Sequence, residues 1–250
     1  NITSFSLVFK LPIILYYLET RKKFFSKFGV LLLISISFFV IIILNTRGAF
    51  LGLFLAILIY VFSLFFIKKK ESLKTKFLKI SFLLATLFLS VSLSNLFLPF
   101  QSESKFVNRA STISFDTKDG SVNQRLRYYR QALKSISNNP FLGIGVGNWK
   151  LKSIEHDKNN IEQYIIPYHA HNDYLQVAAE SGILAFVFYI IVFMVILLML
   201  YNFYLKKKED LFYVMLFSSI AVYLLDSLLN FPIARPISQL SLILIFSFII

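Results

Sequence analysis

The sequence predicts an all-α protein, a polytopic transmembrane helical bundle with a large extracytoplasmic loop that contains amphipathic helices. Its residues are 57% hydrophobic and 17% aromatic, which is more apolar material than a soluble domain of 250 residues buries around one core. Most of its apolar runs have close to the roughly 20 residues that cross a hydrocarbon layer of about 30 Å. The runs lie at residues 28–44, 48–67, 77–98, 182–205, 211–231 and 237–250.

A further apolar stretch opens the chain, SFSLVFKLPIILYYL at 4–18, and Lys10 and Pro12 interrupt it. Because of this interruption, we expect the stretch to be the end of a span whose beginning is missing. The sequence also has no initiator methionine and nothing with the form of a signal peptide. The chain is therefore interpreted as a fragment of a larger membrane protein. It contains no cysteine, which excludes disulfides, thiolate metal sites and cysteine nucleophiles.

The placement of charge gives the expected orientation. Three connectors are strongly basic: RKKFFSK at 21–27, KKKESLKTKFLK at 68–79 and KKKED at 206–210. Loops rich in lysine and arginine stay cytoplasmic, so the turns at 45–48 and 230–236 and the long polar segment are expected outside. The net charge of +13 is explained by these connectors, and no nucleic acid is expected as a partner. The expected division is transmembrane helices at 1–98, an extracytoplasmic loop at 99–181 and transmembrane helices at 182–250.

Arg47 lies at the outer end of two apolar runs, in the segment LNTRGAFLG at 44–52, with no acidic residue near it in the sequence. One interpretation is an interfacial arginine that reaches lipid headgroups. The other is an arginine that holds an anionic ligand. The neighbouring Gly48 and Gly52 lack side chains, which would leave room for such a ligand.

The segment SVNQRLRYYRQALKSISNNP at 121–140 predicts an amphipathic helix, which Ser121 and Gln124 open as a capping box. At 100° per residue, the apolar arc contains Val122, Leu126, Tyr129, Ala132, Leu133 and Ile136. The opposite arc contains Arg127, Arg130 and Lys134, and contact with anionic headgroups explains it most simply. Arg125 falls inside the apolar arc, where an arginine needs an anionic partner.

Glycines at 143, 145 and 147 lie in NPFLGIGVGNWK at 139–150. A dinucleotide loop would need a preceding strand and a crossover unit, and the sequence has neither. We expect a tight turn here, followed by Trp149 at the membrane interface. Further along, Asp226 lies inside the outer end of an apolar run and Arg235 lies just beyond it. An acid at that depth is either functional or part of an Asp226–Arg235 structural pair.

The segment PYHAHNDYLQ at 167–176 contains His169 and His171, two of the three histidines in the chain, followed by Asn172. A metal site needs three or four ligands, and His156 and the scattered acids lack that spacing, so no metal site is predicted. Two interpretations remain. The histidines and Asn172 cap the helix that follows, or a neutral imidazole accepts a proton from a hydroxyl near pH 7.

Three segments follow one another in a recognisable order: TRGAFLG, RLRYYRQALKSISNNPFLGIGVGNW and HAHNDYLQVAAESGILAF. This ordered set, separated by apolar runs, resembles the O-antigen ligase/polymerase family of bacterial membrane glycosyltransferases, over residues from about 40 to 236. The resemblance implies a multi-pass enzyme of the bacterial inner (cytoplasmic) membrane whose active site faces the periplasm or the cell exterior. Such enzymes take a glycan from undecaprenyl diphosphate. The acceptor is a sugar of the lipid A core in the ligase branch and another carrier-linked glycan in the polymerase branch.

The resemblance also implies roles for individual residues. The family's arginine after the span before the large loop matches Arg47, and the arginine that opens the amphipathic helix of the loop matches Arg125. The family's histidine before asparagine matches His171 better than His169. We therefore expect His171, Arg47 and Arg125 to be catalytic and His169, Arg127, Arg130, Asn172, Asp226 and Arg235 to bind substrate.

The chemistry of glycan transfer suits these residues. Arginines bind phosphate oxygens through paired, charged hydrogen bonds, so they would stabilise the leaving diphosphate without a metal ion, and no cofactor is expected. His171 would activate the acceptor hydroxyl, and attack opposite the diphosphate would invert the anomeric centre. Two alternatives stay open: a protein O-oligosaccharyltransferase of the same family, and a transporter of a lipid-linked anion, which would need arginines through the membrane depth or on both faces. The expected partners are the glycan donor, the acceptor and membrane lipids.

Overall fold

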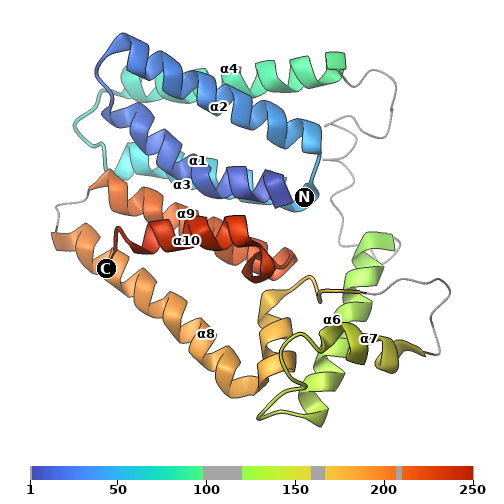
Figure 1. Ribbon diagram of the computed structural model, residues 1–250. Coiled ribbons are helices and arrows are strands. Elements are labelled where there is room, and N and C mark those ends of the chain that lie inside the picture. The colour runs from blue at the N-terminus through green and yellow to red at the C-terminus, as the bar shows by residue number, and fades with distance from the viewer. Residues whose placement is uncertain (1, 98–119, 159–166, 207–209, 250) are drawn as a thin grey trace. The chain divides into compact units, whose positions relative to one another are not determined.

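The computed structural model describes residues 2–97, 120–158, 167–206 and 210–249. Throughout these ranges the secondary structure is helical, and they contain no β-strand (Figure 1). Six of the helices are long and apolar enough to cross a membrane, judged by length and composition. The predicted all-α polytopic bundle is therefore confirmed.

The long helices follow the predicted apolar runs because, in a lipid environment, only a helix satisfies the backbone polar groups of a single span. They are α1 (Ile2–Thr20), α2 (Phe24–Leu44), α3 (Arg47–Phe66), α4 (Leu73–Phe97), α8 (Asp173–Lys206) and α9 (Leu211–Leu229). The opening stretch is a helix of 19 residues that continues through Pro12. The last run is shorter than expected, because α10 (Pro236–Phe246) has 11 residues.

The chain forms two compact units. The first unit consists of Asn1–Ile113, Leu198–Leu224 and Leu240–Ile250, and the second of Ser114–Leu197 and Leu225–Gln239. Helices α8, α9 and α10 each contribute to both units. These units are defined by packing, whereas the division expected at residues 98 and 181 concerns position relative to a membrane, and it stays a prediction.

In the first unit, α1 packs against α2 and α3, and α2 packs against α4 (Figure 1). Asn45 and Thr46 form the tight turn between α2 and α3. Asn45 adopts a left-handed conformation with φ 49°, and its N–H donates to the carbonyl oxygens of Ile41 and Ile42. The Oγ1 of Thr46 lies 3.3 Å from the Oγ of Ser4 on α1, so this turn is tied to the first helix.

Gly52 serves helix packing. A Cβ at this position would lie 3.2 Å from Cγ1 of Val8 and 3.6 Å from Phe5, both on α1, and 3.6 Å from Val222 on α9. The space that we expected beside Gly52 for a ligand is therefore occupied by neighbouring helices. Glycine is used there because it lets apolar side chains of other helices reach the α3 backbone.

A buried polar network joins α1, α3 and α4 near their basic connectors. The hydroxyl of Tyr60 on α3 donates to Oε1 of Glu19 on α1 at 2.7 Å. The Nζ of Lys79 on α4 lies 2.5 Å from Oε2 of Glu19 and 2.7 Å from Oε2 of Glu71. The side chain of Glu19 is only 3% exposed. Every charge in this network has an opposite charge within hydrogen-bonding distance.

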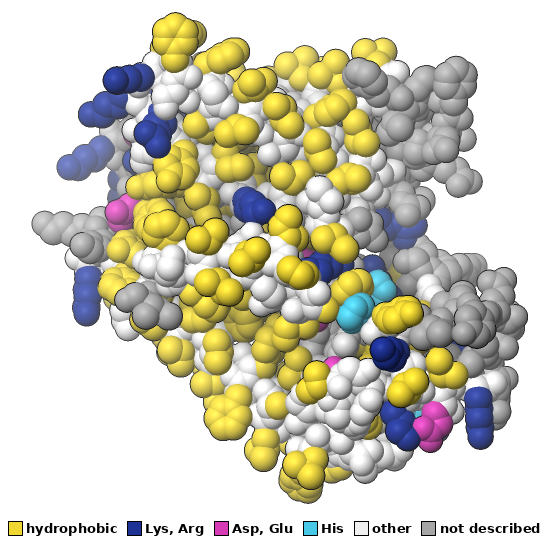
Figure 2. All heavy atoms as spheres, viewed as in Figure 1, with side chains coloured by type: hydrophobic (Ala, Val, Ile, Leu, Met, Phe, Trp, Pro, Cys, Tyr) yellow, Lys and Arg dark blue, Asp and Glu magenta, His cyan; other side chains and the backbone are white. Residues whose placement is uncertain are grey.

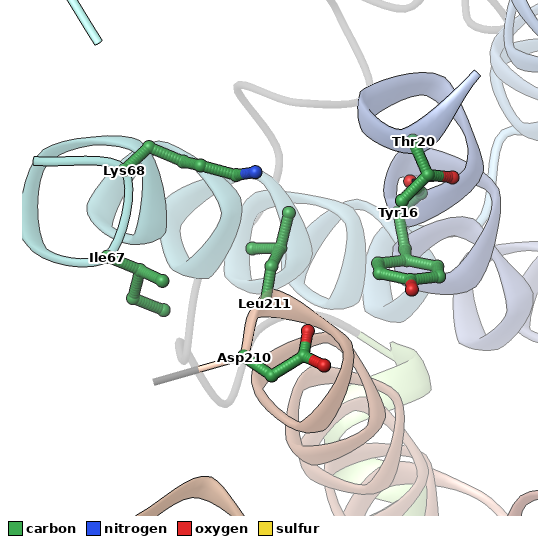
Figure 3. Close-up of a pocket in the computed structure, with 6 residues that line it drawn as sticks. All are labelled: Tyr16, Thr20, Ile67, Lys68, Asp210 and Leu211. Carbon is green, nitrogen blue, oxygen red and sulfur yellow. Dashed lines mark hydrogen bonds between the residues drawn. The ribbon is translucent and has the colours of Figure 1, made fainter. Parts of the chain in front are cut away.

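The first unit contains a cavity of about 230 Å³, and the connector at 206–210 contributes Asp210 to its lining (Figure 3). Its lining consists of Tyr16 and Thr20 of α1, Ile67 and Lys68 after α3, and Asp210 and Leu211 at the start of α9. Figure 2 shows lysine and arginine side chains gathered at the connector end of the α1–α4 helices. Residues of two basic connectors, Lys68 and Asp210, therefore lie together beside Thr20, which directly precedes the connector at 21–27. This arrangement is consistent with the positive-inside interpretation.

Candidate active site

The second unit is organised around Trp149, which is fully buried at the start of α7 (Trp149–Asp157). Its backbone N–H donates to Oε1 of Glu180 at 3.1 Å. The core around it contains Tyr128, Ala132, Ala170 and Ala179. The expectation that Trp149 lies at the membrane interface is wrong, because this large ring instead fills the contact between α6 (Gly120–Asn138), α7 and α8.

Helix α6 buries a different stripe from the predicted apolar arc. Its buried residues are Tyr128, Gln131, Ala132 and Ser135. They follow the i, i+3, i+4, i+7 spacing of one helix face, whereas Leu133 from the predicted arc is 55% exposed. Ser135 can be buried because its hydroxyl has a hydrogen-bond partner: its Oγ lies 3.1 Å from Nε2 of His156 on α7. Hydropathy alone could not anticipate a buried serine whose partner comes from another helix.

The capping box predicted at the start of α6 involves the side chain of Ser121, which lies outside the described residues, so it stays a prediction. The described part of the helix begins at Gly120. The Nε2 of Gln124 donates to the hydroxyl of Tyr128 at 2.8 Å. The end of the helix at Asn138, before Pro140, agrees with the prediction.

Asn172 caps α8. Its Oδ1 accepts the backbone N–H of Leu175 at 3.0 Å. One turn further on, Oε1 of Gln176 accepts the N–H of Ala170 at 3.0 Å, and its Nε2 lies 3.4 Å from Nδ1 of His169. The capping interpretation is therefore confirmed for Asn172 only. Neither histidine is the capping residue.

His171 has a left-handed backbone conformation with φ 56°. This conformation costs a residue other than glycine about 1–3 kcal/mol, so the surroundings must hold it in place. The hydroxyl of Tyr129 on α6 donates to the carbonyl oxygen of His171 at 3.2 Å. The adjacent cap by Asn172 fixes the chain on the other side.

The imidazole of His171 is neutral near pH 7. Burial lowers its pKa to about 4, and the nearby charges of Arg125, His169 and Arg235 act in the same direction. Burial also lowers the pKa of His169. The Nδ1 of His171 is buried and has no hydrogen-bond partner among the described residues. The side chain therefore combines a neutral ring with hydrogen-bonding capacity that the protein does not use.

Phe231 brings three of the predicted site residues together. The ring of His169 stacks on it with centroids 4.1 Å apart, and the ring of His171 meets it at 84° with centroids 5.0 Å apart. The guanidinium carbon of Arg235 lies 4.4 Å from the Phe231 centroid. Sequence reasoning missed Phe231, although its place between Asp226 and a proline turn was an available signal.

Asp226 and Arg235 form the structural pair that was one of the two interpretations. Their closest approach is 3.6 Å, from Nη1 to Oδ2, and both side chains are at most 5% exposed. Asn230 donates to Oδ1 of Asp226 at 2.8 Å. Oδ2 of Asp173, another residue that sequence reasoning missed, accepts the N–H of Ile233 at 2.9 Å and so ties α8 to this segment.

Arg235 keeps unused donors despite its burial. Its Nε and Nη1 atoms make no hydrogen bond within the described residues. Arg125 on α6 is partly buried and close enough to affect the pKa of His171. Arg127 is partly buried and Arg130 is exposed. Arg47 is the first residue of α3 in the first unit, and its participation in the site stays a prediction.

The second unit thus contains most of the predicted site: Arg125, Arg127, Arg130, His169, His171, Asn172, Asp226 and Arg235. In the part of the chain that the structure describes, no three His, Cys, Asp or Glu side chains are grouped as metal ligands would be. What the site offers is a neutral proton acceptor close to fixed positive charges. This combination suits a ligand that has both an anionic group and a hydroxyl to be deprotonated.

Comparison with known families shows the family to which the chain belongs. Residues 30–190, about two thirds of the chain, match the family model described as O-Antigen ligase. The match includes Arg47, Arg125 and His171. No individually curated protein matches the sequence. The chain therefore belongs to the O-antigen ligase family, and it is a multi-pass membrane enzyme of the ligase/polymerase type.

Proposed function

We propose that the protein transfers a glycan from undecaprenyl diphosphate to an acceptor sugar, at the outer face of the inner membrane and without a metal ion. The observation that carries the proposal is the half-buried His171, whose ring is neutral near pH 7 and lies close to the charges of Arg125 and Arg235. A base alone would suit many reactions, and arginines alone would suit simple binding. Together they suit a donor with an anionic leaving group and an acceptor that must lose a proton.

The arginines would take the leaving group. A diphosphate presents several anionic oxygens, and guanidinium groups bind such oxygens through short, charged hydrogen bonds. Arg235 has unused Nε and Nη1 donors, and Phe231 and Asp226 hold its guanidinium in place. Because these contacts gain strength as negative charge develops on the leaving oxygen, they would favour the transition state over bound substrate.

His171 would take the proton. The acceptor oxygen attacks the anomeric carbon, the bond from that carbon to the phosphate oxygen breaks, and the diphosphate leaves with the electron pair. The hydroxyl proton passes to the imidazole, which is neutral beforehand as this step requires. A bound diphosphate would raise the pKa of His171, so the donor itself would make the base stronger.

The left-handed backbone at His171 allows a sharp test. Asparagine tolerates this conformation but cannot serve as a base, so His171→Asn keeps the turn and removes the chemistry. We expect His171→Asn to fold normally and to lose transfer by about 100-fold or more in a purified assay with lipid-linked donor. The matched control is His156→Asn on α7, which should keep transfer. Normal transfer by His171→Asn would contradict the proposal and leave the histidine with a role in the turn only.

We propose a ligase rather than a polymerase or a protein glycosyltransferase. These three enzymes differ in the acceptor that receives the glycan. A deletion strain should accumulate polymer on the carrier and an uncapped lipid A core if the protein is a ligase. Single-repeat glycan would instead indicate a polymerase, and loss of glycan from proteins a protein glycosyltransferase. Movement of lipid-linked anion without transfer by the purified protein would indicate a transporter.

A further inference from the structure

The loop before α7 holds three large apolar side chains outward. Phe141 is 70% exposed, Leu142 87% and Val146 82%, although this loop lies outside the membrane-crossing helices. We propose that these three residues, the apolar tip, form a membrane anchor that inserts into the lipid layer beside α8. The occupant of this surface is the acyl and headgroup boundary of a bilayer.

Backbone hydrogen bonds hold the tip against the kink of α8. This kink lies at Gly182, which has the non-helical angles φ 83° and ψ 171°. The bonds run from Ile144 N to Ala179 O at 2.9 Å, from Gly145 N to Glu180 O at 2.9 Å, and from Ile183 N to Pro140 O at 2.8 Å. They reach both sides of the kink, so loop and helix form one rigid piece.

Two glycines permit this close approach. A Cβ at Gly143 would overlap the backbone of Glu180, and a Cβ at Gly182 would overlap the carbonyl oxygen of Phe141. Both residues also have positive φ, which L side chains rarely adopt. Gly143, the first glycine of the series in the sequence, is therefore needed for packing against α8, and this contact leaves the apolar tip facing outward.

The tip continues the apolar surface of a membrane-crossing helix. The bond from Ile183 to Pro140 sets the loop beside the first turn of α8 after its kink. From there α8 presents exposed apolar side chains, with Leu184 58% and Phe188 67% exposed, as a lipid-facing helix does. A bilayer that surrounds this part of α8 would also receive the tip. Water would otherwise face three large apolar groups at one edge of the protein.

A basic residue next to the tip suits the same partner. Lys150 is exposed in the first turn of α7, shortly after Val146, whereas Lys152 pairs with Glu155. Lysines beside inserted apolar groups are the usual composition of a surface that binds anionic lipid headgroups. The charge next to the tip therefore fits a phospholipid layer better than an apolar protein partner.

An anchored kink would also fix the position of the histidine segment. Residues 173–181 form the helix between His171 and Gly182, and at 1.5 Å per residue they span roughly 14 Å. The anchor would thus hold His171 at a set distance from the membrane surface, where the diphosphate of a lipid-linked donor lies. This consequence rests on the proposed function, whereas the anchor itself does not.

Single-cysteine labelling tests the anchor directly, because the chain contains no cysteine. The full protein carries a nitroxide at Leu142→Cys, at Val146→Cys or, as control, at Glu155→Cys, where the native side chain is 59% exposed. It is reconstituted in nanodiscs of phosphatidylethanolamine and phosphatidylglycerol. We expect the two tip labels to collide with oxygen several-fold more, relative to a water-soluble nickel chelate, than the control label. Equal nickel accessibility at all three positions would overturn the anchor.

A second copy of the chain is the alternative occupant. Spin–spin broadening at Leu142→Cys that disappears on dilution with unlabelled protein would assign the tip to self-association and overturn the proposal. Leu142→Asp should then lower transfer several-fold in nanodiscs, whereas Leu142→Phe should not. Retained transfer by Leu142→Asp, with lipid insertion confirmed by the labels, would overturn the link to the active site alone. Failure of the His171→Asn test would overturn the proposed function and leave the labelling result unaffected.

Discussion

One buried cluster of polar side chains in the first unit and one in the second satisfy their hydrogen bonds differently. In the first unit, Glu19 accepts the hydroxyl of Tyr60 at 2.7 Å and pairs with Lys79 at 2.5 Å. In the second unit, Arg235 and His171 retain buried nitrogens that make no hydrogen bond to any described residue. The nearest acid to Arg235 lies at 3.6 Å, which is long for a hydrogen bond.

This difference between the two clusters indicates which of them is the better candidate for a ligand site. Buried polar groups that satisfy one another stabilise helix packing and leave nothing for a substrate. Buried polar groups with unused donors and acceptors are costly in the empty protein, and a ligand with complementary groups removes that cost. We therefore interpret the Glu19 network as structural and propose that the Arg235–His171 cluster binds the ligand.

The largest expected effects come from a matched pair of conservative substitutions. Arg235→Lys keeps the charge and loses the planar fork, so kcat/KM for transfer should fall about 10- to 100-fold with Tm unchanged. Glu19→Gln keeps hydrogen bonding and loses the charge, so the free energy of unfolding should fall by about 2 kcal/mol. Transfer per folded Glu19→Gln molecule should stay normal. Activity assays and thermal unfolding in nanodiscs check both variants.

The reverse pattern would break the comparison. If Glu19→Gln lowered turnover while Arg235→Lys lowered only stability, the satisfied network would be the functional one. Equal losses of both properties in both variants would remove the distinction between the clusters.

Arg47 extends the comparison to an arginine of the first unit. If it holds a phosphate, Arg47→Lys should lower transfer by roughly tenfold, since a lysine offers a point charge and no paired hydrogen bonds. If it only reaches headgroups, lysine should replace it without loss. The matched control is Arg21→Lys in a basic connector, where no effect is expected. A fully active, normally expressed Arg47→Lys protein would leave Arg125 as the main phosphate-binding residue.

A smaller effect concerns stability and pH. The pKa of His171 is about 4 in the folded protein, against an ordinary value of 6.5. As pH falls from about 6.5 to about 4, the unfolded chain binds a proton that the folded protein does not, so His171 makes the protein progressively less stable. Tm should therefore fall over this range by a few degrees less in His171→Asn than in the unsubstituted protein. If Tm changed with pH equally in both proteins, the His171 imidazole would be exposed to water and the prediction would be wrong.

Much of the fold could be predicted because membrane spans depend on composition over about 20 residues. The start of α8 near Asp173 and the end of α6 before Pro140 were also predicted, since caps and prolines are local signals. The buried face of α6 was predicted wrongly. Ser135 and Gln131 are buried against other helices, and their hydropathy gives no hint of those contacts.

The titratable residues of the candidate site could be predicted from the sequence, and the residues that support them could not. Arg125, His171 and Arg235 stand out because each is a polar residue in an apolar or loop context that composition does not explain. Phe231 and Gln176 do not stand out, since an aromatic residue among 29 phenylalanines carries no signal by itself. Their roles depend on contacts with His169, which the sequence separates from Phe231 by a whole helix pair.

The most direct test of the account is the titration of the three histidine rings by NMR in the full protein, in nanodiscs with and without undecaprenyl diphosphate. His156→Asn and His169→Asn assign the signals. We predict that His171 without ligand stays neutral down to about pH 4. Bound diphosphate should raise its pKa by about 1–3 units, because a nearby anion favours the protonated ring. An unperturbed pKa without ligand, or a pKa that diphosphate leaves unchanged, would contradict the assignment of this cluster to lipid-linked diphosphate.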